Sequence, residues 1–176
     1  MPNTYTLIAS NTLSSSAASV TFSSIPSTYT DLVLKYSVRT NNSVQVGQIS
    51  VKFNASSTSD YSSTDLEASG VSSLAAVSQR SSAGTYANYV YVNGNSSTAS
   101  TFGNGEIYIP NYAGSTNKTF SQFSVTENNA AANVSLDAVA HLRSNAAAIT
   151  EINLANFSTT QFASGSSFFL YGISNS

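Results

Sequence analysis

The single histidine of this 176-residue chain, His141, lies in the segment DAVAHLR, which begins at Asp137. On an extended strand, side chains alternate between two faces, so His141 shares a face with Asp137. A histidine and an aspartate together could activate a serine nucleophile. None of the 36 serines stands in the Gly-x-Ser-x-Gly turn that marks such a nucleophile in one large hydrolase class. We therefore expect no catalytic residue, and we interpret His141 as a strand residue on a polar face or at a contact.

Carboxylates are the second group that could do chemistry. Glycoside hydrolysis requires two of them roughly 5–10 Å apart, and no spacing in the sequence pairs any two. Asp60, Asp65 and Glu67 lie close together in the segment Ser59–Gln79 and could bind calcium. They lack the spacing and the glycine of an EF-hand loop, so a solvated loop is the favoured interpretation. We expect no metal and no cofactor. The eight carboxylates are Asp31, Asp60, Asp65, Glu67, Glu106, Glu127, Asp137 and Glu151.

Tyrosines suit interfaces and sugar stacking, because they offer a large amphipathic area at a low entropic cost. Two groups of them stand out, and core packing, a protein interface and carbohydrate contact are all open to them. Pro110 should end a strand or mark an edge, which would place its neighbouring tyrosines at the rim of the fold. The candidate interface residues are Tyr86, Tyr89, Tyr91, Tyr108 and Tyr112.

Composition excludes several classes of function. Ser, Thr and Asn supply 72 of the 176 residues, whereas charged residues make up only 8%. Six scattered Lys and Arg form no basic stripe, so we expect no binding to nucleic acid. No apolar run approaches the roughly 20 residues of a membrane helix, so we expect no membrane partner. The first ten residues lack the pattern of a signal peptide, so we expect no export through the Sec pathway.

Alternating hydrophobicity predicts an all-β fold. In Thr30–Arg39, one face carries Leu32, Leu34, Tyr36 and Val38, with Val33 as the exception on the other face; in Gln48–Asn54, Ile49, Val51 and Phe53 point inward. Further strands are expected at Tyr5–Ala9, Ser19–Ser23, Ala87–Val92, Gly105–Pro110, Lys118–Val125, Ser135–Leu142, Ile149–Leu154 and Ser167–Ile173. The pattern indicates an antiparallel β-sandwich, jelly-roll-like, of eight to ten short strands.

The whole chain, residues 1–176, is expected to form one domain. Ser59–Gln79 resists assignment and could be a long loop or carry a short helix at Thr64–Ala68. The strand Ser167–Ile173 is apolar on both faces, so it should lie inside the sandwich or against a partner.

Several segments, in order along the whole chain, resemble small virion structural proteins of marine tailed bacteriophages. They are Thr4–Ser10 (TYTLIAS), SSIPSTYTDLVL ending at Leu34, Glu106–Lys118 (EIYIPNYAGSTNK), Val125–Asn129 (VTENN), Ala147–Ile152 (AAITEI) and Gly165–Ile173 (GSSFFLYGI). The resemblance implies a capsid decoration or tail-fibre-associated protein in a virion assembled in the host cytoplasm. It brings no catalytic residues. These proteins tend to have a tryptophan where this chain reads Ala140-His141-Leu142, which leaves the role of that face open.

Three functions remain at this point. The favoured one is a capsid surface decoration protein, also called a knob or cement protein, that acts by protein–protein contacts and is not an enzyme. The alternative is a tail-fibre or receptor-binding module that contacts a host surface glycan. An enzyme acting on host polysaccharide is the third. We expect partners among the virion proteins, namely the major capsid protein or tail proteins, and a homo-oligomer, with a trimer implied by the resemblance.

Overall fold

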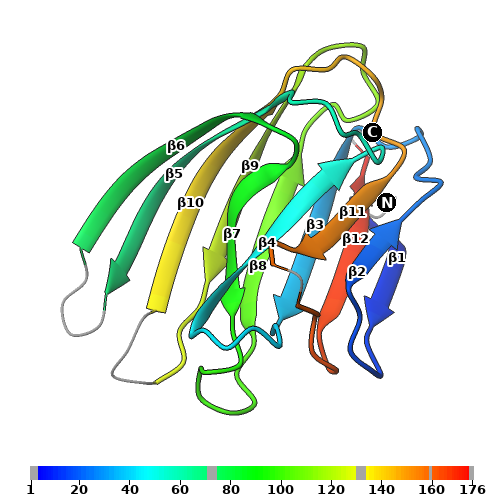
Figure 1. Cartoon of the computed structure of the whole chain (residues 1–176). Helices are drawn as coiled ribbons and strands as arrows, with labels where there is room; N and C mark the ends of the chain where they lie inside the picture. Colours follow the sequence, from blue (N-terminus) through cyan, green and yellow to red (C-terminus); the bar gives the residue numbers. More distant parts are fainter. Residues whose placement is uncertain (1–3, 71–74, 130–133, 159, 175–176) are drawn as a thin grey trace.

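The structure is a computed structural model that describes residues 4–70, 75–129, 134–158 and 160–174. These residues form twelve strands in two antiparallel sheets, which confirms the expected all-β sandwich. Figure 1 shows the smaller sheet lying across one face of the larger one. In spatial order the larger sheet contains β1 (Tyr5–Thr12), β12 (Ser167–Ile173), β3 (Asp31–Val38), β8 (Gly103–Ile109), β9 (Lys118–Val125), β10 (Val134–Arg143), β5 (Tyr61–Gly70) and β6 (Ala75–Gly84). The smaller sheet contains β2 (Ser19–Phe22), β11 (Ile152–Asn156), β4 (Val46–Phe53) and β7 (Ala87–Asn93).

The core lies between the two sheets and is built by alternation. The seven residues predicted to point inward are all buried. β3 and β4 supply them from opposite sheets, so their apolar faces meet across the sandwich. Val33, the apolar residue on the other face of β3, is also buried. It lies opposite Tyr108 and Tyr171 in the neighbouring strands.

The strand predicted from Ser167–Ile173 lies inside the larger sheet. β12 pairs with β1 on one side and with β3 on the other. Phe168 and Leu170 are fully buried, whereas Phe169 and Tyr171 on the opposite face are partly exposed. The inner face of β12 therefore packs in the core, and its outer face is only partly covered.

Most of the described part of the segment Ser59–Gln79 is neither a loop nor a helix. Residues Tyr61–Gly70 form β5, and the chain from Ala75 onward forms β6, while residues 71–74 lie outside the described ranges. The helix considered for Thr64–Ala68 is therefore wrong. β5 pairs with β10 over its full length, and those ladder hydrogen bonds outweigh any local helical preference. The two extra strands raise the count from ten to twelve.

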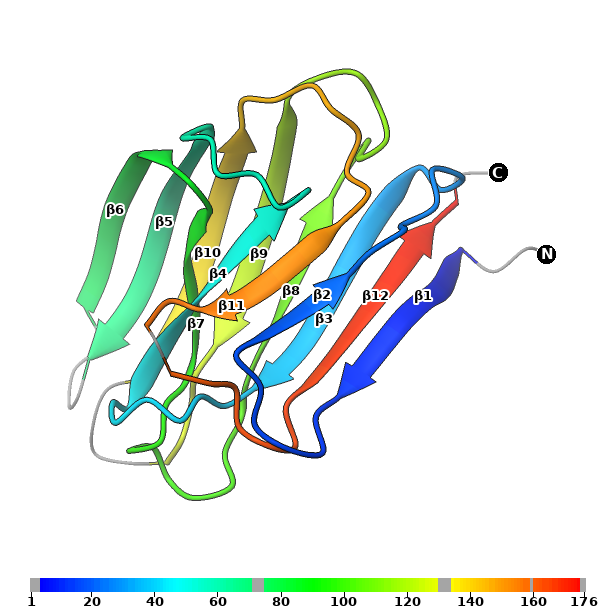
Figure 2. The ribbon, with the colours of Figure 1, turned by 45° about the vertical axis from the view of Figure 1, so that its right-hand side comes forward.

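The larger sheet extends beyond the smaller one at the end formed by β5 and β6. Figure 2 shows these two strands at one side of the sandwich, with β7 as the nearest strand of the smaller sheet. Only one edge of the smaller sheet therefore reaches this end. Polar side chains, described below, line the space between β7 and the larger sheet.

Arg39 binds the loop that connects the two sheets. Its side chain is buried and donates to the carbonyls of Asn95, Ser97, Thr98 and Thr101, at 2.9–3.0 Å. These carbonyls belong to the loop that runs from β7 in the smaller sheet to β8 in the larger one. The guanidinium thus fixes the crossover in one conformation.

Candidate functional site

Part of β9, β10 and β5 has inverted polarity. Their inner positions, which face the smaller sheet, include Gln122, Ser124, Asp65 and Asp137, all buried. Their outer positions carry polar residues such as Ser121 and Thr64 toward one end of the strands, but apolar residues toward the other end. The usual sandwich pattern is the reverse, with polar residues outside and apolar residues inside.

The outer apolar residues form one continuous surface. Across the three strands, Leu66 lies beside Ala138, which lies beside Phe123; in the next row Ala68, Leu136 and Val125 are neighbours. The side chains of Leu66, Phe123 and Leu136 are 60%, 48% and 47% exposed. We call these six residues the outer apolar surface: Leu66, Ala68, Phe123, Val125, Leu136 and Ala138. Contiguous exposed apolar surface is typical of interaction sites in proteins.

An ion pair borders this surface. Lys35 Nζ lies 3.0 Å from Glu106 Oε2, and Glu106 is opposite Phe123 in the next strand. Beyond the pair, β1 carries the exposed Tyr5 and Leu7 on the same sheet. The pair is well exposed on both sides, so it contributes little stability. It does separate two apolar regions of the sheet face.

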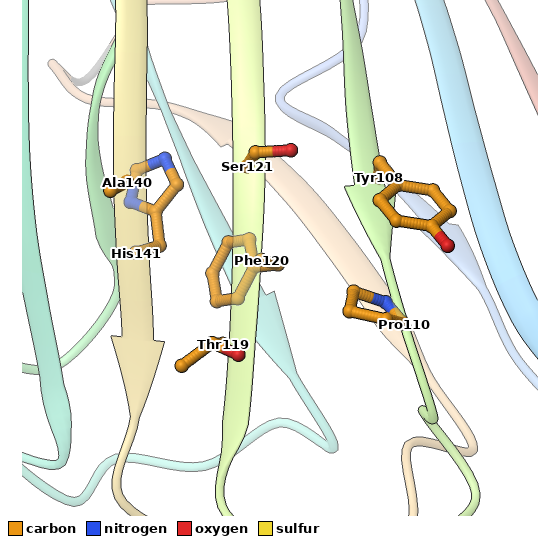
Figure 3. Close-up of a pocket in the computed structure, with 7 residues that line it drawn as sticks. All are labelled: Tyr108, Pro110, Thr119, Phe120, Ser121, Ala140 and His141. Atoms are coloured by element: carbon orange, nitrogen blue, oxygen red, sulfur yellow. The ribbon is translucent and has the colours of Figure 1, made fainter.

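A shallow hollow of about 380 Å³ adjoins the outer apolar surface. Figure 3 shows Tyr108 and Pro110 on one side of β9 and Ala140 on the other. Thr119 and Ser121 add two hydroxyl groups to its lining. The Tyr108 hydroxyl donates to Asp31 Oδ2 at 2.8 Å, which fixes the ring at the rim. A fixed ring beside hydroxyls can contact a sugar or a similar polar ligand.

The five candidate tyrosines do not form one surface. Tyr108 is exposed on the outer face of the larger sheet. Tyr86 precedes β7 in the other layer, where its ring lies 5.7 Å from that of Phe157 and 5.9 Å from Lys52 Nζ. Tyr89 and Tyr91 are half-buried on β7, and Tyr91 lies near the buried polar residues. An interface role for Tyr86, Tyr89, Tyr91 or Tyr108 stays a prediction.

The position of Tyr112 differs from the one expected from the sequence. Tyr112 was expected at the rim, but its side chain is fully buried. β8 ends at Ile109, as Pro110 predicted, and Asn111 then takes a left-handed conformation (φ 47°) that redirects the chain. The Tyr112 ring joins the core, and its hydroxyl donates to the Pro26 carbonyl. The direction taken after the proline is a tertiary effect that spacing alone does not reveal.

His141 pairs with a serine that sequence reasoning did not single out. Its Nδ1 lies 2.9 Å from Ser63 Oγ, its Nε2 lies 3.4 Å from Gln122 Oε1, and its ring stacks on Phe120 at 4.6 Å. Burial lowers the pKa of His141 to about 3, so the ring is neutral at pH 7. Ser63 is also buried. The geometry supports a structural role for the pair.

Asp137 shares the face of His141, as expected, but it makes its contacts elsewhere. Its Oδ2 accepts hydrogen bonds from Ser124 Oγ at 3.1 Å and Ser135 Oγ at 2.8 Å. Burial, with a contribution from the nearby carboxylates, raises its pKa to about 7. Burial also raises the pKa of Asp65 to about 6, again with a neighbouring carboxylate adding to the effect. Asp65 was expected in a solvated loop, and the structure instead buries it with Asp137 between the layers.

Asp60, the third acid of the expected loop, lies apart from Asp65 and Glu67. Its Oδ2 accepts from Arg143 Nε at 3.4 Å and from Thr58 Oγ1 at 2.8 Å. The three acids therefore do not form one site. Their alternation in sequence, Asp65-Leu66-Glu67, is the signal that could have predicted two carboxylates on one strand face.

Two further observations bear on function. Among the described residues, no helix is long and apolar enough to cross a membrane. Comparisons with protein-family models, with curated proteins and with solved structures found no match.

Proposed function

We propose that the protein is a bacteriophage virion structural protein, a capsid surface decoration protein that acts by protein–protein contacts through the outer apolar surface. The inverted polarity of β9, β10 and β5 is the observation that carries the proposal. Apolar side chains such as Leu66 and Phe123 are exposed to water on strands whose neighbouring inner positions are polar. Covering them with a partner would remove that apolar area from water, which favours association.

The composition supports the same function. Interfaces are depleted in Lys, Glu and Asp, and none of the six residues of the outer apolar surface is charged. With 14 charged residues in the chain, little like-charge repulsion opposes association. The resemblance of the sequence to small virion proteins supports a location in the virion, assembled in the host cytoplasm, with the major capsid protein or tail proteins as partners.

Phe123 is the residue to test, because aromatic anchors tend to dominate binding energy. It is about half exposed, so its burial should contribute roughly 1–2 kcal/mol, or about tenfold in affinity. We expect the Phe123→Ser variant to bind heads that lack the protein about ten times more weakly in a co-sedimentation assay. Phe157→Ser is the matched control, since Phe157 is also a half-exposed phenylalanine but lies just after β11 in the other layer.

Both variants should unfold at nearly the same temperature, so that any difference in binding reflects contact alone. Equal binding by the two variants would refute the assignment of the surface. Weaker binding by Phe157→Ser alone would place the contact on the smaller sheet.

We also propose that the protein forms a homo-oligomer, with a trimer as the state suggested by the resemblance. Closed cyclic symmetry is the commonest arrangement of soluble homo-oligomers. Sedimentation of the isolated protein at tens of micromolar tests this, and a strictly monomeric species would refute it.

A tail-fibre or receptor-binding module that contacts a host glycan is the second candidate function. The hollow beside Tyr108, with the hydroxyls of Thr119 and Ser121, favours it. If the hollow holds a sugar, Tyr108→Ala should abolish binding to host cells or surface polysaccharide. Binding that survives this substitution would remove the candidate.

A further inference from the structure

Three carboxylates converge in the space between the sheets. Asp65 and Glu67 lie two residues apart on the inner face of β5, and Asp137 lies directly opposite Glu67 on β10. One oxygen from each lies within 4.8 Å of one from each of the others. Two oxygens bound to the same cation at about 2.4 Å can be at most about 4.8 Å apart, so the spacing suits a shared ion.

The carboxylates are only partly satisfied by hydrogen bonds. Gln79 Nε2 donates to Asp65 Oδ2 at 3.3 Å and to Glu67 Oε2 at 3.0 Å. The other oxygens of the two aspartates, Asp65 Oδ1 and Asp137 Oδ1, are inaccessible to solvent and accept no hydrogen bond. A buried carboxylate oxygen without a partner is costly, so it indicates a missing partner such as a cation or a proton.

No cationic side chain of the described residues forms an ion pair with the group. Within the described ranges, the ion pairs join Lys35 to Glu106 and Arg143 to Asp60, and none reaches the three carboxylates. Arg80, on the adjacent strand β6, donates to Thr64 on the outer face. Neutralisation of these three carboxylates therefore requires a cation or protons from solution.

A second hollow of about 300 Å³ reaches this group at Glu67. Glu67, Tyr91 and Ser135 are part of its lining. It is large enough for several water molecules, and the hydroxyls of Tyr91 and Ser135 offer further oxygen ligands. Ca²⁺ takes six to eight oxygen ligands and accepts irregular geometry, whereas Mg²⁺ requires a near-ideal octahedron.

We propose that Asp65, Glu67 and Asp137 form a Ca²⁺ site that ties β5 to β10 at the end of the larger sheet. The bound ion would give Asp65 Oδ1 and Asp137 Oδ1 the partner that they lack. It would also stabilise the part of the sheet that presents Leu66 and Leu136 on the opposite face. The site does not depend on the function proposed above.

Isothermal titration of the chelator-treated full chain with CaCl₂ at pH 7.5 tests the site. We expect one Ca²⁺ per chain and a rise in melting temperature on the order of 5 °C at saturating Ca²⁺. Mg²⁺ at the same concentration should have a smaller effect. Absence of Ca²⁺ binding by the wild-type protein would overturn the proposal.

Variants locate the ion. Asp137→Asn and Glu67→Gln should each lose the Ca²⁺-dependent rise, whereas the control Glu106→Gln, an exposed carboxylate on β8, should keep it. Tb³⁺ replaces Ca²⁺ in oxygen sites and emits when a nearby tyrosine is excited, so Tyr91 should sensitise its emission. This emission keeps the test informative if one variant fails to fold. Ca²⁺ binding that persists in both cluster variants, or Tb³⁺ emission that Ca²⁺ does not displace, would refute the assignment.

Discussion

The buried, neutral state of His141 leads to a specific prediction about pH. Burial lowers the pKa of the imidazole from 6.5 to about 3 in the folded protein. Between these two values the unfolded chain binds a proton that the folded chain does not bind. The contribution of His141 to the free energy of unfolding is therefore fully present above pH 6.5 and falls as the pH falls.

The size of the effect follows from the shift. Each pH unit below 6.5 costs about 1.4 kcal/mol, so the fall from pH 6.5 to pH 4.5 costs about 3 kcal/mol. The variant His141→Gln lacks this loss, because a glutamine amide does not titrate. Its amide can still exchange hydrogen bonds with Ser63 and Gln122. Other acids titrate in the same range, but both proteins contain them, so they cancel in the comparison.

The assay is urea denaturation of wild type and His141→Gln at pH 7 and at pH 4.5, with a chelator present. We expect the stability of wild type relative to the variant to fall by about 3 kcal/mol between these pH values. Because the chain has a single histidine, its imidazole NMR signal needs no further assignment and should not titrate above pH 4.5 in the folded protein. A constant stability difference, or an NMR midpoint near 6.5, would show that the ring is accessible and refute its structural role.

Substitutions at three further residues test the packing by urea denaturation. Arg39→Lys should lower the free energy of unfolding by about 2–4 kcal/mol, because one ammonium cannot reach the four carbonyls that the guanidinium binds; a loss below 0.5 kcal/mol would contradict this. Tyr112→Phe, which leaves the Pro26 carbonyl without its donor, should cost about 1–2 kcal/mol and Tyr112→Ala about 3–5 kcal/mol. An unchanged free energy of unfolding in Tyr112→Ala would mean that this ring is not in the core. Leu34→Ala should cost roughly 2–5 kcal/mol, and a change well under 1 kcal/mol would contradict its assignment to the inner face.

The fold was predictable wherever the inner face of a strand is apolar. In Asp31–Val38 and Val46–Phe53, alternation identified the buried side chains and therefore the sheet faces. The signal failed in β5, because Asp65 and Glu67 point inward and interrupt the apolar pattern that marks a strand. Pairing with β10 over ten residues holds this strand in place, and such long-range contacts leave no mark on the local sequence.

The outer apolar surface was missed for a related reason. In β9, Phe120 points into the core while Phe123, three residues later, points to solvent. Alternation demands this, since residues three apart on a strand lie on opposite faces. A sequence analysis that expects phenylalanines inside does not separate them. The spacing of Phe120 and Phe123 does indicate that one of them points outward. Which of the two is exposed becomes clear only from the structure, in which Gln122 and Ser124 are buried.

We propose that the outer apolar surface holds this chain against another virion protein. Cryo-electron microscopy of virions from a phage that encodes the chain tests this proposal most directly. We expect density for the sandwich on the capsid surface, with Leu66, Phe123 and Leu136 packed against a neighbouring protein. A particle in which these three side chains face solvent, or in which the chain is absent from the capsid, would contradict it.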